Sequence, residues 1–306
     1  MGLHERIGTI LTTTGKPSMR KVERSVHWSK DRRGFLSVLE SEVQSRLIDL
    51  RSSVLVVGAS DDDVDVLRRV GFQNITVSNF GADLGGFGDA TGCGDSEALL
   101  IDVEDIRLPS SSYDLILSHE VLHHCRSPHR ALCEMLRISR KYVLFLEPND
   151  SLCMRTLVGL GLSFPYELPA VIHHGGKSGG VRNSQIPNFI YRWNRHEVEK
   201  TVSSYIAERF FSIFTHPYWD FNVSEYELSL RRATKIGVFT SLVGPKTFIR
   251  FLQGIKLLLN LLPVTEKQGN KFFCIVEKHA QLRPWLSSKE DQIVFTGGQN
   301  GARSSL

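Results

Sequence analysis

The chain has 306 residues, 41% of them hydrophobic, which is enough to bury a sizeable core in one large domain or two smaller ones. Its formal net charge of +4 is mild, and basic and aromatic residues are not interleaved, so nothing points to a nucleic-acid partner. The five cysteines are scattered and form no Cys-x-x-Cys pair, which argues against disulfides and indicates the reducing cytoplasm. No apolar run reaches the roughly 18 residues of a membrane span, so no stable membrane insertion is expected.

The first 33 residues are polar and basic, and we expect them to be a leader or a lid rather than a partner-binding arm. The next segment, residues 34–48, predicts an amphipathic helix because apolar residues recur at four-residue spacing. These residues are Phe35, Leu39, Val43 and Leu47.

Short apolar strands then alternate with helices. Strands are expected at 53–57, 74–79, 98–101, 113–118 and 142–147, as near-continuous apolar runs that suit burial on both faces. Three aspartates at 61–63 favour a helix start, and Gly71 ends that helix. Ser127 and Pro128 predict a second helix start. This order predicts right-handed crossovers and a parallel sheet.

A polar segment, Ser118 to His124, follows the fourth of these strands directly. In parallel sheets, ligands bind in the crevice beyond the carboxyl ends of the strands, so a binding site is expected here. The alternative is a polar loop without a role, and the segment taken alone supports both interpretations equally.

The regular alternation loosens after residue 148. Residues 151–193 are rich in glycine and aromatic residues and predict an insertion over the site. Asn194, with Glu197 three residues later, predicts a capped helix, and further strands are expected at 210–214 and 271–278. The apolar residues 247–262 predict a core or dimer-interface helix, with a membrane-surface helix as the alternative. The tail, 286–306, is expected to be disordered.

Five βα-type units with these turns resemble the class I S-adenosylmethionine-dependent methyltransferases, most closely the methyltransferase type 11 family. The similarity covers roughly residues 50–150 and is strongest from Asp102 to Pro109 and from Tyr113 to His124. Two departures stand out: the turn after the first strand keeps Gly58 alone of the family's glycines, and Asn79 replaces the acid that usually holds the ribose.

The resemblance implies an α/β fold with a Rossmann-like, seven-stranded, mostly parallel sheet and helices on both faces. It assigns this domain to residues 34–285, with residues 151–193 as a substrate cap after strand five. It also implies S-adenosyl-L-methionine as the cofactor, held at the strand ends. The implied cofactor contacts are Gly58, Ala59, Ser60, Asn79, Asp102, Val103, Ser118 and His119.

An acceptor hydroxyl can need a base, and a histidine, with an unperturbed pKa of about 6.5, suits proton transfer at neutral pH. The candidates are His119, His123 and His124, together with Glu147 on the acceptor side. Each histidine has packing as its alternative role, and Glu147 has an ion pair with an arginine. A second pair of histidines, His173 and His174, lacks clear partner ligands, so no metal site is expected.

Three functions are compatible with these observations. The leading one is a cytoplasmic methyltransferase that methylates oxygen or nitrogen of a small-molecule or glycan acceptor, in a chain that could form a homodimer. A Rossmann-type NAD(P) oxidoreductase would explain the turn at 57–60, but the later glycines and a Tyr-x-x-x-Lys pair are missing. The degenerate glycine turn supports a cofactor-less binding protein. Fold alone does not decide among them.

Overall fold

The structure is a computed structural model that describes most of the chain. The described residues are 30–46, 48–80, 98–173, 175–206, 210–221, 225, 228, 235–279, 286–289 and 292–295. The expected leader, apart from its last residues, therefore lies outside the described residues, and so do residues 81–97, which are rich in glycine and aspartate.

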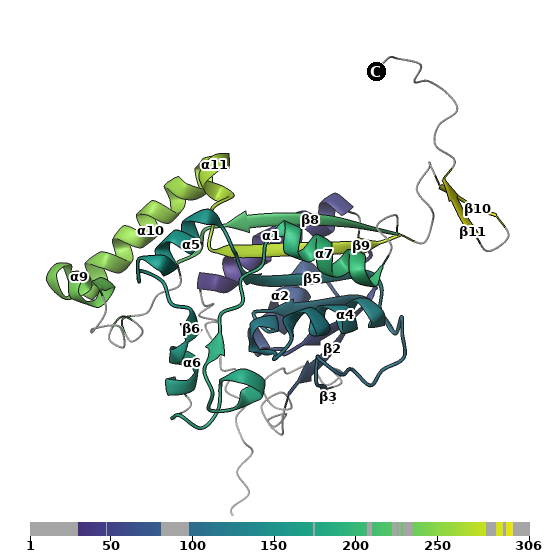
Figure 1. The fold of residues 1–306 in the computed structure, drawn as a ribbon, viewed down its shortest axis with the longest axis horizontal. Helices are drawn as coiled ribbons and strands as arrows, with labels where there is room; N and C mark the ends of the chain where they lie inside the picture. The colour runs from purple at the N-terminus through teal and green to yellow at the C-terminus, as the bar shows by residue number, and fades with distance from the viewer. Residues whose placement is uncertain are drawn as a thin grey trace, which may run out of the picture.

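Seven strands form one sheet in the order β3-β2-β1-β4-β5-β9-β8 (Figure 1). The strands β1 to β5 run parallel, and β9 runs antiparallel to both of its neighbours. The predicted α/β fold with a mostly parallel seven-stranded sheet is confirmed. The strands are β1 (Ser53–Val57), β2 (Asn74–Asn79), β3 (Ala98–Leu100), β4 (Tyr113–His119), β5 (Ser139–Pro148), β8 (Phe211–Tyr218) and β9 (Lys271–Lys278).

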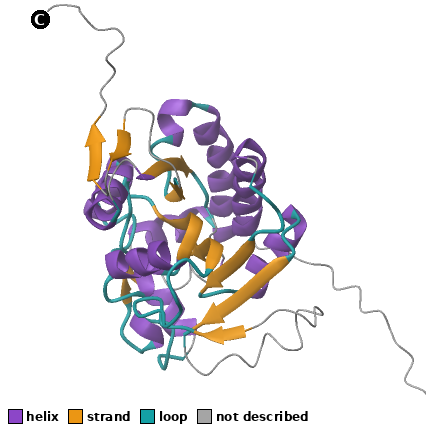
Figure 2. Cartoon of the chain, turned by 90° about the vertical axis from the view of Figure 1, so that its right-hand side faces the viewer, coloured by secondary structure: helices purple, strands orange, loops and turns teal. Residues whose placement is uncertain are grey.

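Helices cover both faces of this sheet (Figure 2). On one face lie α1 (Lys30–Arg46) and α2 (Asp61–Val70), and on the other α4 (Pro128–Ile138) and α7 (Arg195–Tyr205). Side chains of a strand alternate between the two layers: in β1, Val54 and Val56 join the α1–α2 core, whereas Leu55 and Val57 join the α4–α7 core. All four are buried, which explains why the strand reads as a continuous apolar run.

The helices begin where the local sequence predicts. Ser60 and Asp63 form a capping box at the start of α2, and Gly71 ends this helix with a left-handed φ of 110°. Ser127 caps α4, with Pro128 in the first turn. The Oδ1 atom of Asn194 accepts a 2.9 Å hydrogen bond from the N–H of Glu197 at the start of α7.

The predicted insertion gathers beyond the end of β5, at the left of Figure 1. It contains α5 (Leu152–Gly159), β6 (Tyr166–Glu167), α6 (Leu168–His173), the 3₁₀ turn η2 (Val181–Asn183) and β7 (Asn188–Phe189), and β6 pairs with β7. Trp193 lies outside this cap. It is fully buried in the main core, with its ring 5.7 Å from that of Phe145. Since its carbonyl also pairs with the N–H of Asp150, the chain has returned to the sheet by this residue.

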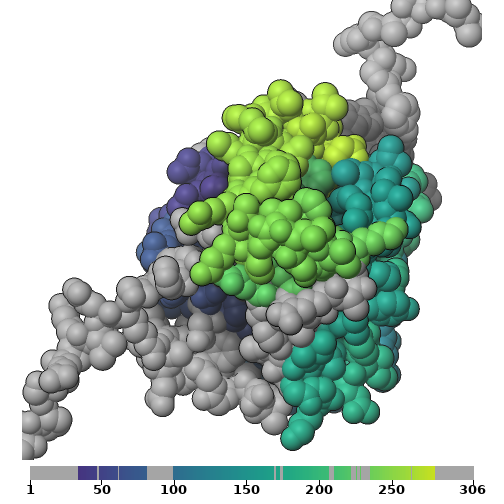
Figure 3. Space-filling model, turned by 90° about the vertical axis from the view of Figure 1, so that its left-hand side faces the viewer, coloured from purple at the N-terminus to yellow at the C-terminus, as the bar shows by residue number. Residues whose placement is uncertain are grey.

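Three further helices lie at the same end of the sheet, and they form the yellow-green surface of Figure 3. They are α9 (Lys235–Val243), α10 (Pro245–Leu261) and α11 (Pro263–Glu266). No residue of α10 is buried, and Leu257 and Leu261 are 66% and 64% exposed. The core alternative for this helix is therefore wrong, because its apolar residues surround the helix and one layer of neighbours covers only part of them. Among the described residues, no helix is long and apolar enough to cross a membrane.

The tail contains one unexpected element. Strands β10 (Leu286–Lys289) and β11 (Gln292–Phe295) form an antiparallel pair where a disordered tail is expected. The run Ile293-Val294-Phe295 consists of β-branched and aromatic residues, which favour a strand.

Candidate active site

A cavity of about 330 Å³ opens at the carboxyl ends of β1, β2 and β4, beside the residues that follow β3. The lining includes Gly58, Asn79, Asp102, Val103 and His119, five of the eight predicted cofactor contacts. The other three, Ala59, Ser60 and Ser118, lie outside the described lining. Parallel strands bring these segments together because their carboxyl ends meet at one edge of the sheet.

Gly58 is required by the shape of the first turn. It has a φ of +62°, and a Cβ atom at this position would lie 2.6 Å from Cγ2 of Val121. Both the left-handed backbone and the close approach therefore exclude a larger residue. The one glycine that remains of the family's glycine loop is thus the one on which the turn depends.

The rest of this turn is engaged by the chain itself. The N–H of Ala59 donates to the carbonyl of Ser78, and both the N–H and the hydroxyl of Ser60 donate to Asp63. The other carboxylate oxygen of Asp63 lies 2.9 Å from Nδ1 of His119. Asp63 therefore caps α2 and fixes the imidazole of His119, which is 2% exposed.

The cap reaches into the cavity through Arg182. Its Nη2 atom lies 2.6 Å from Oδ2 of Asp102, and Nη1 lies 3.2 Å from Glu104. Its guanidinium carbon is 4.8 Å from the centre of the Phe80 ring, at cation–π distance. Arg182 of the cap thus forms an ion pair with Asp102, the carboxylate that the family resemblance assigns to the adenine. Asn79 also has a partner in the chain, because its Oδ1 atom accepts the N–H of Phe80.

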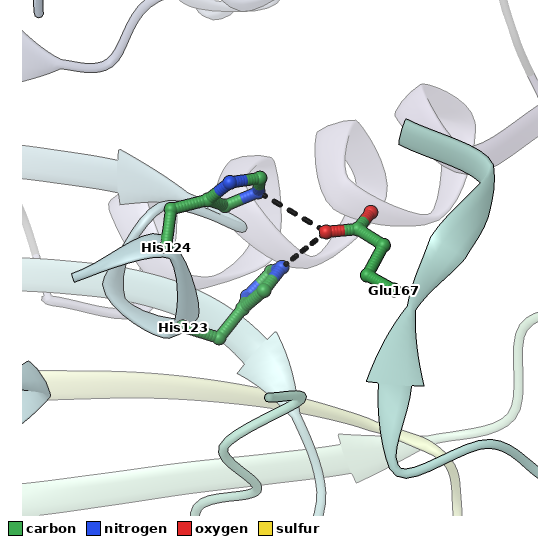
Figure 4. A group of neighbouring side chains, drawn as sticks. All are labelled: His123, His124 and Glu167. Atoms are coloured by element: carbon green, nitrogen blue, oxygen red, sulfur yellow. Dashed lines mark ion pairs between the residues drawn. The ribbon is translucent and has the colours of Figure 1, made fainter. Parts of the chain in front are cut away.

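Two neighbouring histidines face a glutamate of the cap (Figure 4). The 3₁₀ turn η1 (Leu122–His124) follows β4, and the Nε2 atoms of His123 and His124 lie 3.5 and 3.4 Å from Oε2 of Glu167. Behind them, Oε2 of Glu147 is 2.6 Å from Nδ1 of His123, and its Oε1 accepts the N–H of Leu122 at 2.7 Å. Glu147 thus pairs with a histidine rather than with the arginine of its alternative role, and it positions the whole turn.

The pKa values of the two histidines shift in opposite directions. Burial alone would lower the pKa of His123, but Glu147 and Glu167 outweigh it and raise this pKa to about 10. Burial, followed by the charge on His123, lowers the pKa of His124 to about 4. At neutral pH His123 is therefore an imidazolium ion, and His124 is neutral. The neutral ring lines the cavity, and Nδ2 of Asn188 lies 2.6 Å from its Nδ1.

A second and larger cavity of about 690 Å³ adjoins the first at Glu120, which lines both. Its walls come mainly from apolar residues of α5, α9 and α10, including Leu157, Phe239 and Leu252. The residue at the junction, Glu120, has a φ of +57° and an ion pair with Lys271. Backbone of this kind is costly for a residue other than glycine and is typical of functional sites.

Some residues of the site come from outside the strand ends and were not predicted. Glu120 lies inside the polar segment Ser118 to His124, yet Glu167 and Arg182 come from the insertion, where no spacing rule connects them to the sheet. The glycines at 179 and 180 were the available signal for a tight approach near Arg182. The predicted pair at 173 and 174 lies outside the described side chains.

Comparisons with known proteins give one family model and several solved structures. Residues 87–146 match the family model described as "Methyltransferase domain", which confirms the resemblance found in the sequence. No curated protein matches the chain.

Among solved structures, the YcgJ protein from Bacillus subtilis is 12% identical, with a TM-score of 0.49 over 81% of this chain and all of that one. A putative methyltransferase from Bacillus halodurans, BH2331, is also 12% identical, with a TM-score of 0.45 over 80% and 100% of the two chains. Magnesium protoporphyrin IX methyltransferase from Synechocystis, solved with S-adenosylhomocysteine, is 12% identical, with a TM-score of 0.42 over 62% and 78%. Since all three scores lie below 0.5, the functional argument rests on the motif and the site.

Proposed function

We propose that this chain, in which residues 87–146 match a methyltransferase domain, transfers a methyl group from S-adenosyl-L-methionine to a small acceptor molecule with an apolar body. One observation carries the choice of acceptor: the cavity at the strand ends adjoins, at Glu120, a larger cavity walled by apolar side chains. Such pockets, with few polar groups at one end, suit a ligand that is held by its apolar part and oriented by its polar part.

The residues of the first cavity fit the cofactor. Asp102 would accept a hydrogen bond from an exocyclic amine, and Phe80 and Val103 offer apolar contact to a flat base. Asn79 keeps an amide N–H₂ group for a ribose hydroxyl, since its oxygen already accepts from Phe80. The turn at Gly58 allows close backbone approach, which a Cβ atom would prevent.

When bound, the cofactor supplies a methyl group that a sulfonium already activates. The chain then has to align acceptor and methyl, and such positioning can remove several kcal/mol from a barrier, on the order of 7 or more in favourable cases. Glu120 lines both cavities and His124 lines the first, so we assign these two polar groups to contact with the acceptor's reacting atom. His123 and Glu147 are buried behind them, and we assign them to positioning rather than to proton transfer.

Two related proposals and one alternative acceptor complete this function. The reducing cytoplasm remains the location that the cysteine pattern suggests. A homodimer through α10 would cover the exposed leucines of that helix. A glycan acceptor is the alternative: most of the lining residues of the second cavity are apolar, but Ser163, Asp220 and Asn270 could bind sugar hydroxyls.

The experiment measures transfer of labelled methyl from S-adenosyl-L-methionine to a panel of apolar alcohols, phenols, amines and soluble glycans. Leu252→Trp fills the second cavity from α10, whereas Leu257→Trp adds the same bulk on the exposed side of that helix. We expect apolar acceptors to be methylated, with a raised KM in Leu252→Trp and unchanged kinetics in Leu257→Trp. Methylation of glycans alone, or equal kinetics in both variants, would contradict the proposed acceptor.

A further inference from the structure

The cluster of His123, His124 and Glu167 has more order than a chance contact of polar side chains. All three ligand-type atoms lie within 4.8 Å of one another (Figure 4). They come from two different segments, the turn η1 and the cap strand β6, and the pairing of β6 with β7 fixes the latter. Two imidazoles and one carboxylate are a ligand set that divalent zinc prefers at sites with one open position.

The distances within the cluster are compatible with a metal site. The separations of 3.5 and 3.4 Å between the imidazole nitrogens and Oε2 of Glu167 are longer than ordinary N–H···O hydrogen bonds. In a tetrahedral zinc site with metal–nitrogen distances of about 2.1 Å, neighbouring ligand atoms stand about 3.4 Å apart. Two edges of the cluster therefore have the length of a zinc coordination shell, and the third, between the two imidazole nitrogens, lies within 4.8 Å.

The groups behind the cluster also match such a site. Histidine ligands typically donate their second N–H to a carboxylate, which fixes the ring and strengthens the ligand. His123 has this partner, since Oε2 of Glu147 lies 2.6 Å from its Nδ1.

His124 has Asn188 at 2.6 Å, and the amide oxygen of Asn188 is buried without a hydrogen-bond partner in the described part of the chain. A half-turn of that amide would place this oxygen at Nδ1 of His124, where it would accept the N–H of a metal-bound ring. This rotation of the amide would break the hydrogen bond from Nδ2 of Asn188 to Glu167, and the bound ion would then balance the charge of Glu167.

We infer that His123, His124 and Glu167 bind a divalent transition-metal ion, with Zn²⁺ the best fit to the ligand set.

Its open position would lie between the two cavities, because His124 lines the first and Glu167 the second. There it would hold an oxygen, nitrogen or sulfur atom of the acceptor and make an acceptor hydroxyl or thiol more acidic. This last role rests on the proposed function, whereas metal binding itself does not.

The test is titration of the full chain, freed of any affinity tag, with Zn²⁺ and with Co²⁺ as its spectroscopic substitute, without cofactor or acceptor. We expect one equivalent to bind with a dissociation constant in the micromolar range or below, and cobalt to give the visible absorption of a four-coordinate site. His124→Ala and Glu167→Gln should each weaken binding at least tenfold. Both side chains are partly exposed, which favours folding of the variants.

His216→Gln is the matched control. His216 and Glu266 form another histidine–glutamate pair, whose nitrogen and oxygen atoms are also 3.5 Å apart, and neither residue belongs to the cluster. It should leave binding unchanged. Glu147→Gln should weaken binding by about 10- to 100-fold through the orientation of His123. Absence of stoichiometric binding, or equal binding in the wild type, His124→Ala and Glu167→Gln, would overturn the metal site. Metal binding without methyl transfer would support the metal site and would contradict the proposed function instead.

Discussion

The guanidinium of Arg182 and the carboxylate of Asp102 form an ion pair with a 2.6 Å contact inside the cavity at the strand ends. The same guanidinium lies over the ring of Phe80. An adenine that donates to Asp102 and stacks near Phe80 would need the space that the cap arginine holds. The cap and the proposed cofactor therefore compete for one carboxylate.

Arg182→Ala should consequently tighten binding of S-adenosylhomocysteine. Partly exposed ion pairs contribute up to about 1 kcal/mol, so we expect a gain of up to roughly fivefold in affinity by calorimetry. Arg107→Ala is the control, because Arg107 pairs with Asp105 on the exposed side of the same loop. Weaker binding in Arg182→Ala would mean that the arginine closes over the ligand rather than competing with it.

Gly58→Ala tests the first turn. A left-handed alanine costs about 1–2 kcal/mol, and its Cβ would also meet the side chain of Val121 at 2.6 Å. We expect a loss of about 2–3 kcal/mol in the free energy of unfolding in urea, together with weaker S-adenosylhomocysteine binding. Adding Val121→Ala should restore part of this loss, because it removes the steric contact but not the backbone strain. Additive losses would show that the two residues do not meet.

Asp114 makes stability depend on pH in the acid range. Burial would raise its pKa, but hydrogen bonds from the Ser53 N–H, Arg140 and the Ser53 hydroxyl outweigh burial and lower this pKa to about 2. The side chain is 21% exposed, so we expect a contribution of about 1–2 kcal/mol at neutral pH. This contribution is complete above the unfolded pKa and is lost as the pH falls from about 4 to about 2. Urea unfolding should therefore separate wild type from Asp114→Asn at pH 7 and bring them together near pH 2; a constant difference would contradict the assignment.

Trp193 marks where the cap ends and the core resumes. Because it is fully buried between Phe145 and the ring of His129, Trp193→Ala should cost about 3–5 kcal/mol of unfolding free energy. Tyr166→Ala, at an aromatic residue of the cap that is 50% exposed, should cost less than about 1 kcal/mol. Equal losses would place Trp193 with the cap, as the sequence pattern suggested.

The strands and helix starts could be predicted because their determinants are local. Val54 to Val57 form a buried strand because of their own side chains, and Asn194 caps a helix through a neighbour three residues away. The position of the site also followed from the sequence, since the carboxyl ends of parallel strands meet at one edge. Gly58, Asp102 and His119 accordingly line one cavity.

The partners of these residues could not be predicted, because they depend on how the insertion folds back. Arg182 meets Asp102 across 80 residues, and Glu167 meets His123 across 44, through a cap whose sequence has no regular period. The same holds for Glu147: its position at the end of β5 was evident, but its pairing with His123 depends on the turn after β4.

The most direct test of the account is calorimetric titration of the full chain with S-adenosylhomocysteine, with NAD and NADP as controls. We predict micromolar binding of S-adenosylhomocysteine, no binding of either dinucleotide, and a loss of at least tenfold in affinity in Asp102→Asn. Asp105→Asn, an exposed neighbour outside the cavity, should bind as the wild type does. Binding of NAD or NADP instead, or binding of none of the three, would contradict the proposal that this cavity holds S-adenosyl-L-methionine.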